Sequence, residues 1–134
     1  MNKILLSLCL VAGAAHADWV RIGSSLKDPA LYMDSSAVER PAPNRIRLWN
    51  IVDYASVQQH DGKDYRSALV NYEFDCDRGA FRELIRVLHK DAMGSGVTVY
   101  WTHGLWSWAR GPGAWNLPEQ GSVESALVGA GCGA

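Results

Sequence analysis

The chain is poor in cysteine and lacks the short motifs that mark enzymes. Three of its 134 residues are cysteine, and none of them forms the C-x-x-C spacing used by redox sites and many metal sites. The sequence contains no H-E-x-x-H, no G-x-S-x-G and no phosphate-binding loop. We therefore expect a protein that is not an enzyme and that holds no cofactor and no metal.

An excess of charge of either sign is also missing. The chain has 13 Lys and Arg against 14 Asp and Glu, for a formal net charge of −1. Nucleic-acid-binding domains carry a basic patch or stripe, so we do not expect nucleic acid as a partner. Beyond residue 17, no apolar run approaches the roughly 20 residues that cross a bilayer. We therefore do not expect an integral membrane protein.

The N-terminus has the three-part layout of a secretory signal peptide. Lys3 gives a cationic start, residues 4–11 are almost wholly apolar, and Ala15-His16-Ala17 forms an A-x-A cleavage motif before Asp18. The alternative is an N-terminal hydrophobic strand, which explains neither Lys3 nor the A-x-A motif. We predict that residues 1–17 are removed on export and that residues 18–134 form a single domain.

Removal of the signal leaves the two cysteines Cys76 and Cys132. In an exported domain, such a pair predicts a structural disulfide. A metal pair or redox pair is the alternative, and both normally need closer spacing. The ring of about 57 residues would contribute roughly 4 kcal/mol to stability. Cys9 leaves with the signal. Leu8 precedes it where a lipoprotein signal normally has Gly or Ala, so we expect no lipid anchor.

Alternating apolar and polar residues predict a mainly β domain. The clearest strand runs from Tyr65 to Cys76, with Cys76 on the apolar, core-facing side. Asp61-Gly62 predicts a hairpin turn before it, after a long β-prone run over residues 45–57. Ser122 is a good N-cap for a short helix that leads to Cys132. A disulfide from Cys76 requires this C-terminal segment to pack on the core face of the strand.

Residues 79–91 fit two patterns. Phe81, Leu84, Ile85 and Leu88 recur at helical spacing. In the strand interpretation, Phe81, Ile85 and Val87 lie on the buried face, whereas Leu84 and Leu88 lie on the exposed face. Periodicity alone slightly favours the helix.

Seven segments, spread over nearly the whole mature chain, have a characteristic order and spacing: residues 19–23, 31–34, 49–54, 65–67, 72–76, 93–96 and 115–132. Together they resemble the surface-adhesin protein E family of Gram-negative bacteria. The resemblance implies a curved antiparallel sheet of about six strands, with a C-terminal helix tethered to its concave face by the disulfide. It also implies that residues 80–91 form a strand, and we adopt that prediction. The fold class is therefore α+β, mainly β.

Tryptophan is abundant, and its placement suggests one binding surface. Large aromatic side chains with a nearby arginine recur at binding surfaces, although tryptophans can instead close one end of a small core. Three tryptophans fall within strand patterns or at the family positions, and we predict that they belong to the core: Trp19, Trp49 and Trp115. The candidate binding surface consists of Trp101, His103, Trp106, Trp108 and Arg110.

Elsewhere in the chain, the sequence gives only weak signs of a reactive site. Asp75 and Asp77 flank Cys76 and share one strand face, which we interpret as a solvated face rather than a carboxylate pair. His60 lies at the predicted hairpin tip, where polar residues are common.

Two functions from different classes remain. The first is an envelope binding module of the adhesin E type, which takes a protein or glycan ligand at the sheet rim and at residues 106–110. An exposed sheet edge would also allow a homodimer. The second is a small periplasmic structural or accessory protein with no adhesive role. Both place the exported chain in the periplasm or at the cell surface of a Gram-negative bacterium.

Overall fold

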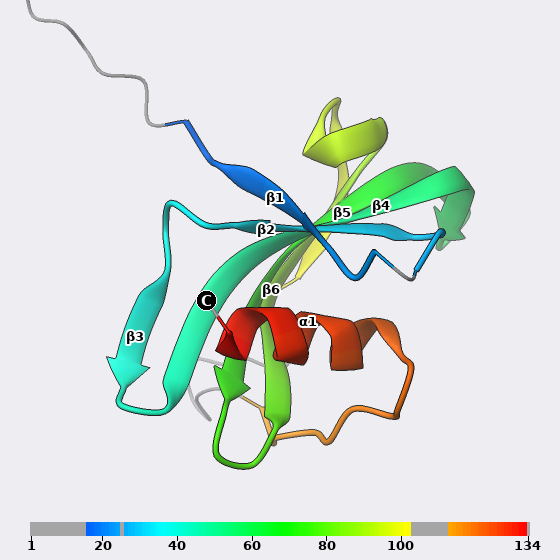
Figure 1. Cartoon of the computed structure of the whole chain (residues 1–134). Coiled ribbons are helices and arrows are strands. Elements are labelled where there is room, and N and C mark those ends of the chain that lie inside the picture. The colour runs from blue at the N-terminus through cyan, green and yellow to red at the C-terminus, as the bar shows by residue number, and fades with distance from the viewer. Residues whose placement is uncertain (1–15, 25, 103–112, 134) are drawn as a thin grey trace, which may run out of the picture.

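The fold is an antiparallel sheet covered on one face by a C-terminal helix. The computed structural model describes residues 16–24, 26–102 and 113–133. The sheet has seven strands in the order β1-β2-β4-β5-β6-β7, with β3 paired to β4 beside this path. Figure 1 shows α1 crossing in front of the curved strands β4, β5 and β6. The predicted mainly β fold with one helix at the C-terminal end is confirmed. The elements are β1 Trp19–Ile22, β2 Ala30–Asp34, β3 Glu39–Ala42, β4 Arg45–His60, β5 Lys63–Asp75, β6 Ala80–His89, the 3-10 turn η1 Ala92–Gly94, β7 Thr98–Thr102 and α1 Val123–Cys132.

The hairpin of β4 and β5 forms the centre of the sheet. Its turn consists of Asp61 and Gly62, with φ angles of 47° and 74°. Positive φ at both central residues is the requirement of the type I′ turn, which suits the twist of a hairpin and favours Asp-Gly. His60 and Lys63 are the pair that closes the strands. The predicted turn is therefore confirmed.

The core lies between α1 and the helix-covered side of the sheet, here called the helix face. Alternate residues of β4 and β5 point into it, as the period of a strand requires. Leu127 of α1 packs against them and is 1% exposed. The predicted core face of β5 is confirmed. Its members are Ala68, Val70, Tyr72 and Phe74.

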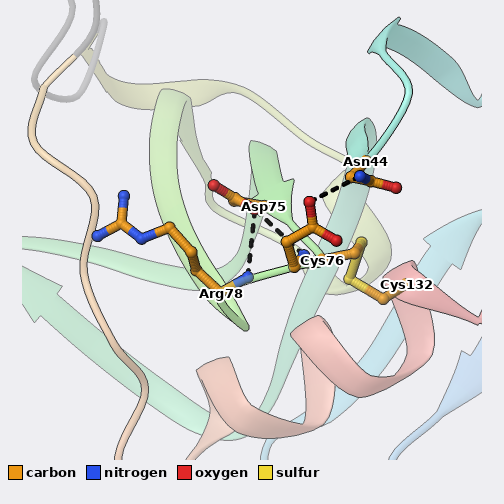
Figure 2. The surroundings of a disulfide bond; sticks show 6 residues. Asn44, Asp75, Cys76, Arg78 and Cys132 are labelled. Atoms are coloured by element: carbon orange, nitrogen blue, oxygen red, sulfur yellow. Dashed lines mark hydrogen bonds between the residues drawn. A yellow bond between two sulfur atoms is a disulfide. The ribbon is translucent and has the colours of Figure 1, made fainter.

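The disulfide joins the end of β5 to the end of α1. Cys76 and Cys132 are bonded, with their Cα atoms 5.6 Å apart, and Figure 2 shows the bond beside the last turn of the helix. Ser122 caps the helix, since its side chain accepts a hydrogen bond from the nitrogen of Ser125. The predicted bridge and N-cap are both confirmed, and the two fix α1 at both of its ends.

β6 is a strand, as the family resemblance implied, but it contains a β-bulge. Asn71 pairs with Ile85, whereas its neighbour Tyr72 pairs with Glu83, so Leu84 is the extra residue. A bulge shifts the alternation of side chains by one position. The two halves of β6 therefore present opposite sets of residues to the core.

This shift makes part of the predicted burial of β6 wrong. Phe81, before the bulge, pairs with Phe74 and packs against the core as expected. Leu88, after the bulge, pairs with Ala68 and is 3% exposed, although we expected it on the solvent face. Ile85, which we expected to be buried, lies on the opposite face. Strict alternation of side chains along β6 therefore predicts the wrong face for the residues after Leu84.

The three tryptophans predicted as core residues lie outside the core. Trp19, Trp49 and Trp115 are all half-buried, and none belongs to the core cluster. Trp49 alternates with the buried Leu48 and so faces away from α1, on the outer face of the sheet. Trp115 packs beneath the guanidinium group of Arg82, 4.0 Å from its ring centroid. Strand alternation and this cation–π contact hold these side chains at the periphery of the core.

Candidate ligand-binding surfaces

Of the five residues predicted as a binding surface, Trp101 lies within the described part of the chain. His103, Trp106, Trp108 and Arg110 lie outside the described residues. Trp101 belongs to β7, the last strand in the order of the sheet, and is 58% exposed. The structure therefore places Trp101, with its side chain exposed, at the β7 end of the sheet.

Tyr100 adds a second aromatic side chain at this end. It is 37% exposed and pairs with Leu88, so it lies on the helix face, while Trp101 lies on the outer face. The ring of His60, from the end of the β4–β5 hairpin, lies 4.2 Å from the ring of Tyr100. The hairpin tip, predicted as a polar turn, thus also contacts the β7 end of the sheet, through Tyr100.

The bulge in β6 creates a polar site on the helix face that our sequence interpretation missed. Residues three apart on a regular strand point to opposite faces, but the extra residue Leu84 brings Glu83 and Arg86 to the same side. Arg86 Nη2 lies 2.8 Å from Glu83 Oε1, and it donates a longer hydrogen bond of 3.4 Å to the hydroxyl of Tyr72. Tyr54 and Tyr65 pack edge to face nearby, at 5.9 Å between ring centroids.

The Arg86 guanidinium stays charged, and the Tyr72 and Tyr54 hydroxyls stay neutral, near pH 7. Burial opposes the charge of Arg86, but its hydrogen bond to Glu83 and the neighbouring tyrosines raise the pKa of its guanidinium above the ordinary value. Burial also raises the pKa of the Tyr72 and Tyr54 hydroxyls above 10. The cluster therefore offers a permanent cation and neutral phenol groups. Such groups can bind a polar ligand but cannot exchange protons readily at pH 7.

A second charged cluster lies on the outer face. Glu73 is fully buried, and its two oxygens accept hydrogen bonds from Arg47 Nε at 2.5 Å and from Arg82 Nη2 at 2.7 Å. Burial alone would raise the pKa of Glu73, but these two guanidinium groups hold it below its ordinary value of 4.5. The carboxylate is thus ionised and occupied, which suits it to structure rather than to proton transfer.

Arg82 also fastens the segment before α1 to the sheet. Its guanidinium stacks on Trp115, and its Nη1 approaches the carbonyl oxygen of Gly113 at 3.5 Å. Phe81 and Asn116 exchange backbone hydrogen bonds of 2.9 and 2.8 Å. The role of Trp115 is therefore to hold this segment in place.

Asp75 and Asp77 stabilise the turn after β5, and they do not act as a carboxylate pair. Asp75 Oδ1 accepts hydrogen bonds from the backbone nitrogens of Asp77 and Arg78 at 3.2 and 3.3 Å. Asp77 Oδ2 accepts from Asn44 Nδ2 at 2.6 Å, and Figure 2 shows this network beside Cys76. Among the described residues, no three His, Cys, Asp or Glu side chains gather in a way that could hold a metal ion.

The fold and these surfaces define a small, disulfide-bonded antiparallel β domain closed by a C-terminal helix. The model of the surface-adhesin protein E family matches residues 19–133, so the chain belongs to this family of adhesin-like surface proteins. In the part of the chain that the structure describes, no helix is both long and apolar enough to span a bilayer.

Solved structures of one bacterial protein have the same fold. Protein E from non-typeable Haemophilus influenzae superposes with a TM-score of 0.58 at 11% identity, over 90% of this chain and 79% of the other. A second structure of Haemophilus influenzae protein E gives the same TM-score and identity, over 88% and 86% of the two chains. At this identity the likeness shows the fold alone. A comparison with curated proteins gave no match.

Proposed function

We propose that this chain is an exported, non-catalytic binding module of the cell envelope that takes a protein or glycan ligand at the β7 end of its sheet. Membership of the surface-adhesin protein E family supports an adhesive role. The cationic start, apolar run and A-x-A motif of residues 1–17 support export with loss of that segment.

The observation that carries the proposal is the exposure of two large aromatic side chains at neighbouring positions of β7. Trp101 is 58% exposed and Tyr100 is 37% exposed. Tryptophan and tyrosine dominate binding energies because they are large and rigid and bury much area at a small entropic cost. Because residues 106–110 follow β7 closely in the sequence, we propose that Trp106, Trp108 and Arg110 extend this surface.

A binding role also fits the state of the ionisable groups. Glu73 is held between two guanidinium groups, and Glu83 is paired with Arg86. General acid–base catalysis needs a group whose pKa lies near the working pH. In the described residues, these carboxylates are committed to ion pairs instead.

The test compares binding by two variants of this surface, Trp101→Ala and Tyr100→Ala, with binding by a control variant. Residues 18–134 are applied to a glycan array and to an array of envelope peptides, and the affinity for each positive probe is measured. Trp101→Ala should weaken binding by about tenfold or more, the usual effect of removing an aromatic hot spot. Val20→Ala is the matched control, because it removes an exposed apolar side chain from β1 at the other end of the sheet. Binding that survives Trp101→Ala and Tyr100→Ala alike would contradict the proposal.

The second candidate is a periplasmic structural or accessory protein. It is favoured by the position of β1 at the end of the strand order, where an edge strand is suited to pairing with a second copy. Protection from protease on intact cells would support this candidate over the adhesive one.

A further inference from the structure

The carboxylate of Asp34 is buried without an ion-pair partner among the described residues. Asp34 ends β2 and is 6% exposed. No Lys, Arg or His of the described residues forms an ion pair with it. Moving a carboxylate out of water is costly unless it is paired or well hydrogen-bonded. The environment of Asp34 therefore has to supply donors.

All the donors that reach Asp34 converge on one of its two oxygens. Oδ1 accepts hydrogen bonds from the backbone nitrogen of Ser36 at 3.0 Å, from the Ser36 hydroxyl at 2.6 Å and from the backbone nitrogen of Asp18 at 3.1 Å. Burial alone would raise the pKa of Asp34, but these bonds hold it below its ordinary value of 3.8. The ionised group thus still has a second oxygen, Oδ2, that accepts no hydrogen bond from the described residues.

Asp18 is also the first of the described residues that forms a hydrogen bond with the rest of the fold. Its carbonyl oxygen accepts hydrogen bonds from the nitrogen and the hydroxyl of Ser35, at 3.0 and 3.2 Å. His16 and Ala17 before it are exposed and have no hydrogen bond or ion pair with other described residues. Among the described residues, hydrogen bonding to the fold therefore begins at the residue that follows the A-x-A motif.

We propose that cleavage between Ala17 and Asp18 creates the missing cation, an α-ammonium group on Asp18 that forms an ion pair with Asp34. The inference rests on the proposed loss of residues 1–17. Hydrolysis consumes one water molecule and breaks the C–N bond between Ala17 and Asp18. Ala17 leaves with a carboxylate, and the amide N–H of Asp18 becomes –NH₃⁺. The water supplies both added hydrogens and the added oxygen.

The geometry favours this pairing. The nitrogen of Asp18 already lies 3.1 Å from Asp34 Oδ1. An α-amino group has an ordinary pKa of about 7.7–8.0, so it is mostly charged at neutral pH. Cleavage therefore adds one positive charge and two N–H donors beside a carboxylate whose Oδ2 accepts no hydrogen bond from the described residues. The processed chain gains a charge-assisted hydrogen bond that the precursor cannot form.

A double-mutant cycle on the exported domain tests the pairing. Chains that begin at Asp18 and at Ala17 are compared, each with Asp34 or with Asp34→Asn. With Asp34 present, the chain that begins at Asp18 should have an unfolding equilibrium constant about tenfold lower, the usual effect of a charge-assisted hydrogen bond. Asp34→Asn should abolish this difference. Asp28→Asn is the matched control, because Asp28 also accepts a backbone hydrogen bond, from Ala55 at 3.0 Å, and should leave the difference intact.

A second measurement needs no substitution at Asp34. The rate at which acetic anhydride acylates the α-amine is compared for the native and the unfolded chain that begins at Asp18. An ion-paired ammonium should react about tenfold more slowly in the native protein, because one unit of pKa is a tenfold change in the free amine. Equal rates, or a cycle without coupling, would overturn the inference.

The processing step is checked by the intact mass of the protein recovered from the envelope of the expressing bacterium. A mass equal to residues 18–134 with one disulfide is expected. Cleavage at another bond would overturn the inference, even where the cycle shows coupling in the engineered chains. Neither the mass nor the cycle involves a ligand, so these failures are distinguishable from failure of the binding surface at β7.

Discussion

Replacing Gly131 with alanine should destabilise the protein, although alanine is the better helix former. A Cβ atom at Gly131 would lie 2.6 Å from Cε2 and 2.7 Å from Cδ2 of Phe74, and 3.2 Å from Cδ1 of Leu48. Both of these side chains are buried, so the helix or the ring has to move. Overpacking of this kind costs about 1–3 kcal/mol.

Gly129 provides a matched control in the same helix. A Cβ atom there would meet nothing within 4 Å. Gly129→Ala should therefore gain the roughly 1 kcal/mol by which alanine exceeds glycine in a helix interior. Gly131→Ala gains the same helix propensity, but overpacking against Phe74 and Leu48 opposes this gain. The difference between the two variants isolates the steric cost, which we expect to be about 1–3 kcal/mol.

Urea unfolding followed by circular dichroism measures this difference. The two variants should share the slope of the free energy of unfolding against urea and differ in midpoint, with Gly131→Ala unfolding at the lower concentration. Equal midpoints would mean that α1 does not approach Phe74 closely, and the close packing of the helix on the sheet would be refuted.

Cys132→Ser should cost about 4 kcal/mol, because it removes a cross-link over a sequence separation of 56 residues. Cys76→Ser should give the same loss in urea, and unequal losses would mean that one thiol has a separate role. Glu73→Gln should cost about 3 kcal/mol, since it leaves the nearly buried Arg82 without its counter-charge. The stability from Glu73 should be full above its ordinary pKa of 4.5 and lost as pH falls through its lower native value. In urea unfolding measured from pH 3 to 7, Glu73→Gln should reduce this loss of stability at low pH. An unchanged loss would contradict the assigned role of Glu73. Ser122→Ala should cost about 1 kcal/mol, because the cap on the Ser125 nitrogen is lost, and a thermal melt shows it.

The centre of the sheet was predictable because several local signals agree there. Asp61-Gly62 favours one turn type, and the strand after it alternates without interruption up to Cys76. These two signals place Cys76 on the helix face, and the bridge then requires α1 to cover that face. Sequence patterns succeed where the chain follows one period over a long run.

β6 was harder to predict because a bulged strand imitates a helix. The extra residue at Leu84 brings Phe81 and Leu88, seven positions apart, to the same face. Residues seven apart also share a face of a helix, which is why periodicity favoured that alternative. The i, i+3 spacing of Glu83 and Arg86 was the one available signal for their pairing. On a regular strand this spacing puts the two side chains on opposite faces, so it predicts a contact only if the bulge is known.

The candidate surface was predictable in part. Trp101 was proposed because tryptophan is concentrated around it, and its side chain is exposed. Tyr100 and His60 meet only because the β4–β5 hairpin reaches β7. Contacts between segments so distant in sequence leave no local pattern. The size of tryptophan suggested burial for Trp49, but size alone does not indicate which face of a strand a residue occupies.

The outer-face cluster has a consequence for how the strands find one another. Arg47, Glu73 and Arg82 stand directly opposite one another on β4, β5 and β6. A slip of two residues keeps every side chain on its own face, so alternation alone does not exclude it. Such a slip between β5 and β6 would set Glu73 opposite Ala80 or Leu84, and a buried carboxylate would lose one of its two cations. The cluster therefore disfavours misaligned pairings of β5 and β6 during folding, even those that keep every hydrophobic side chain on its own face.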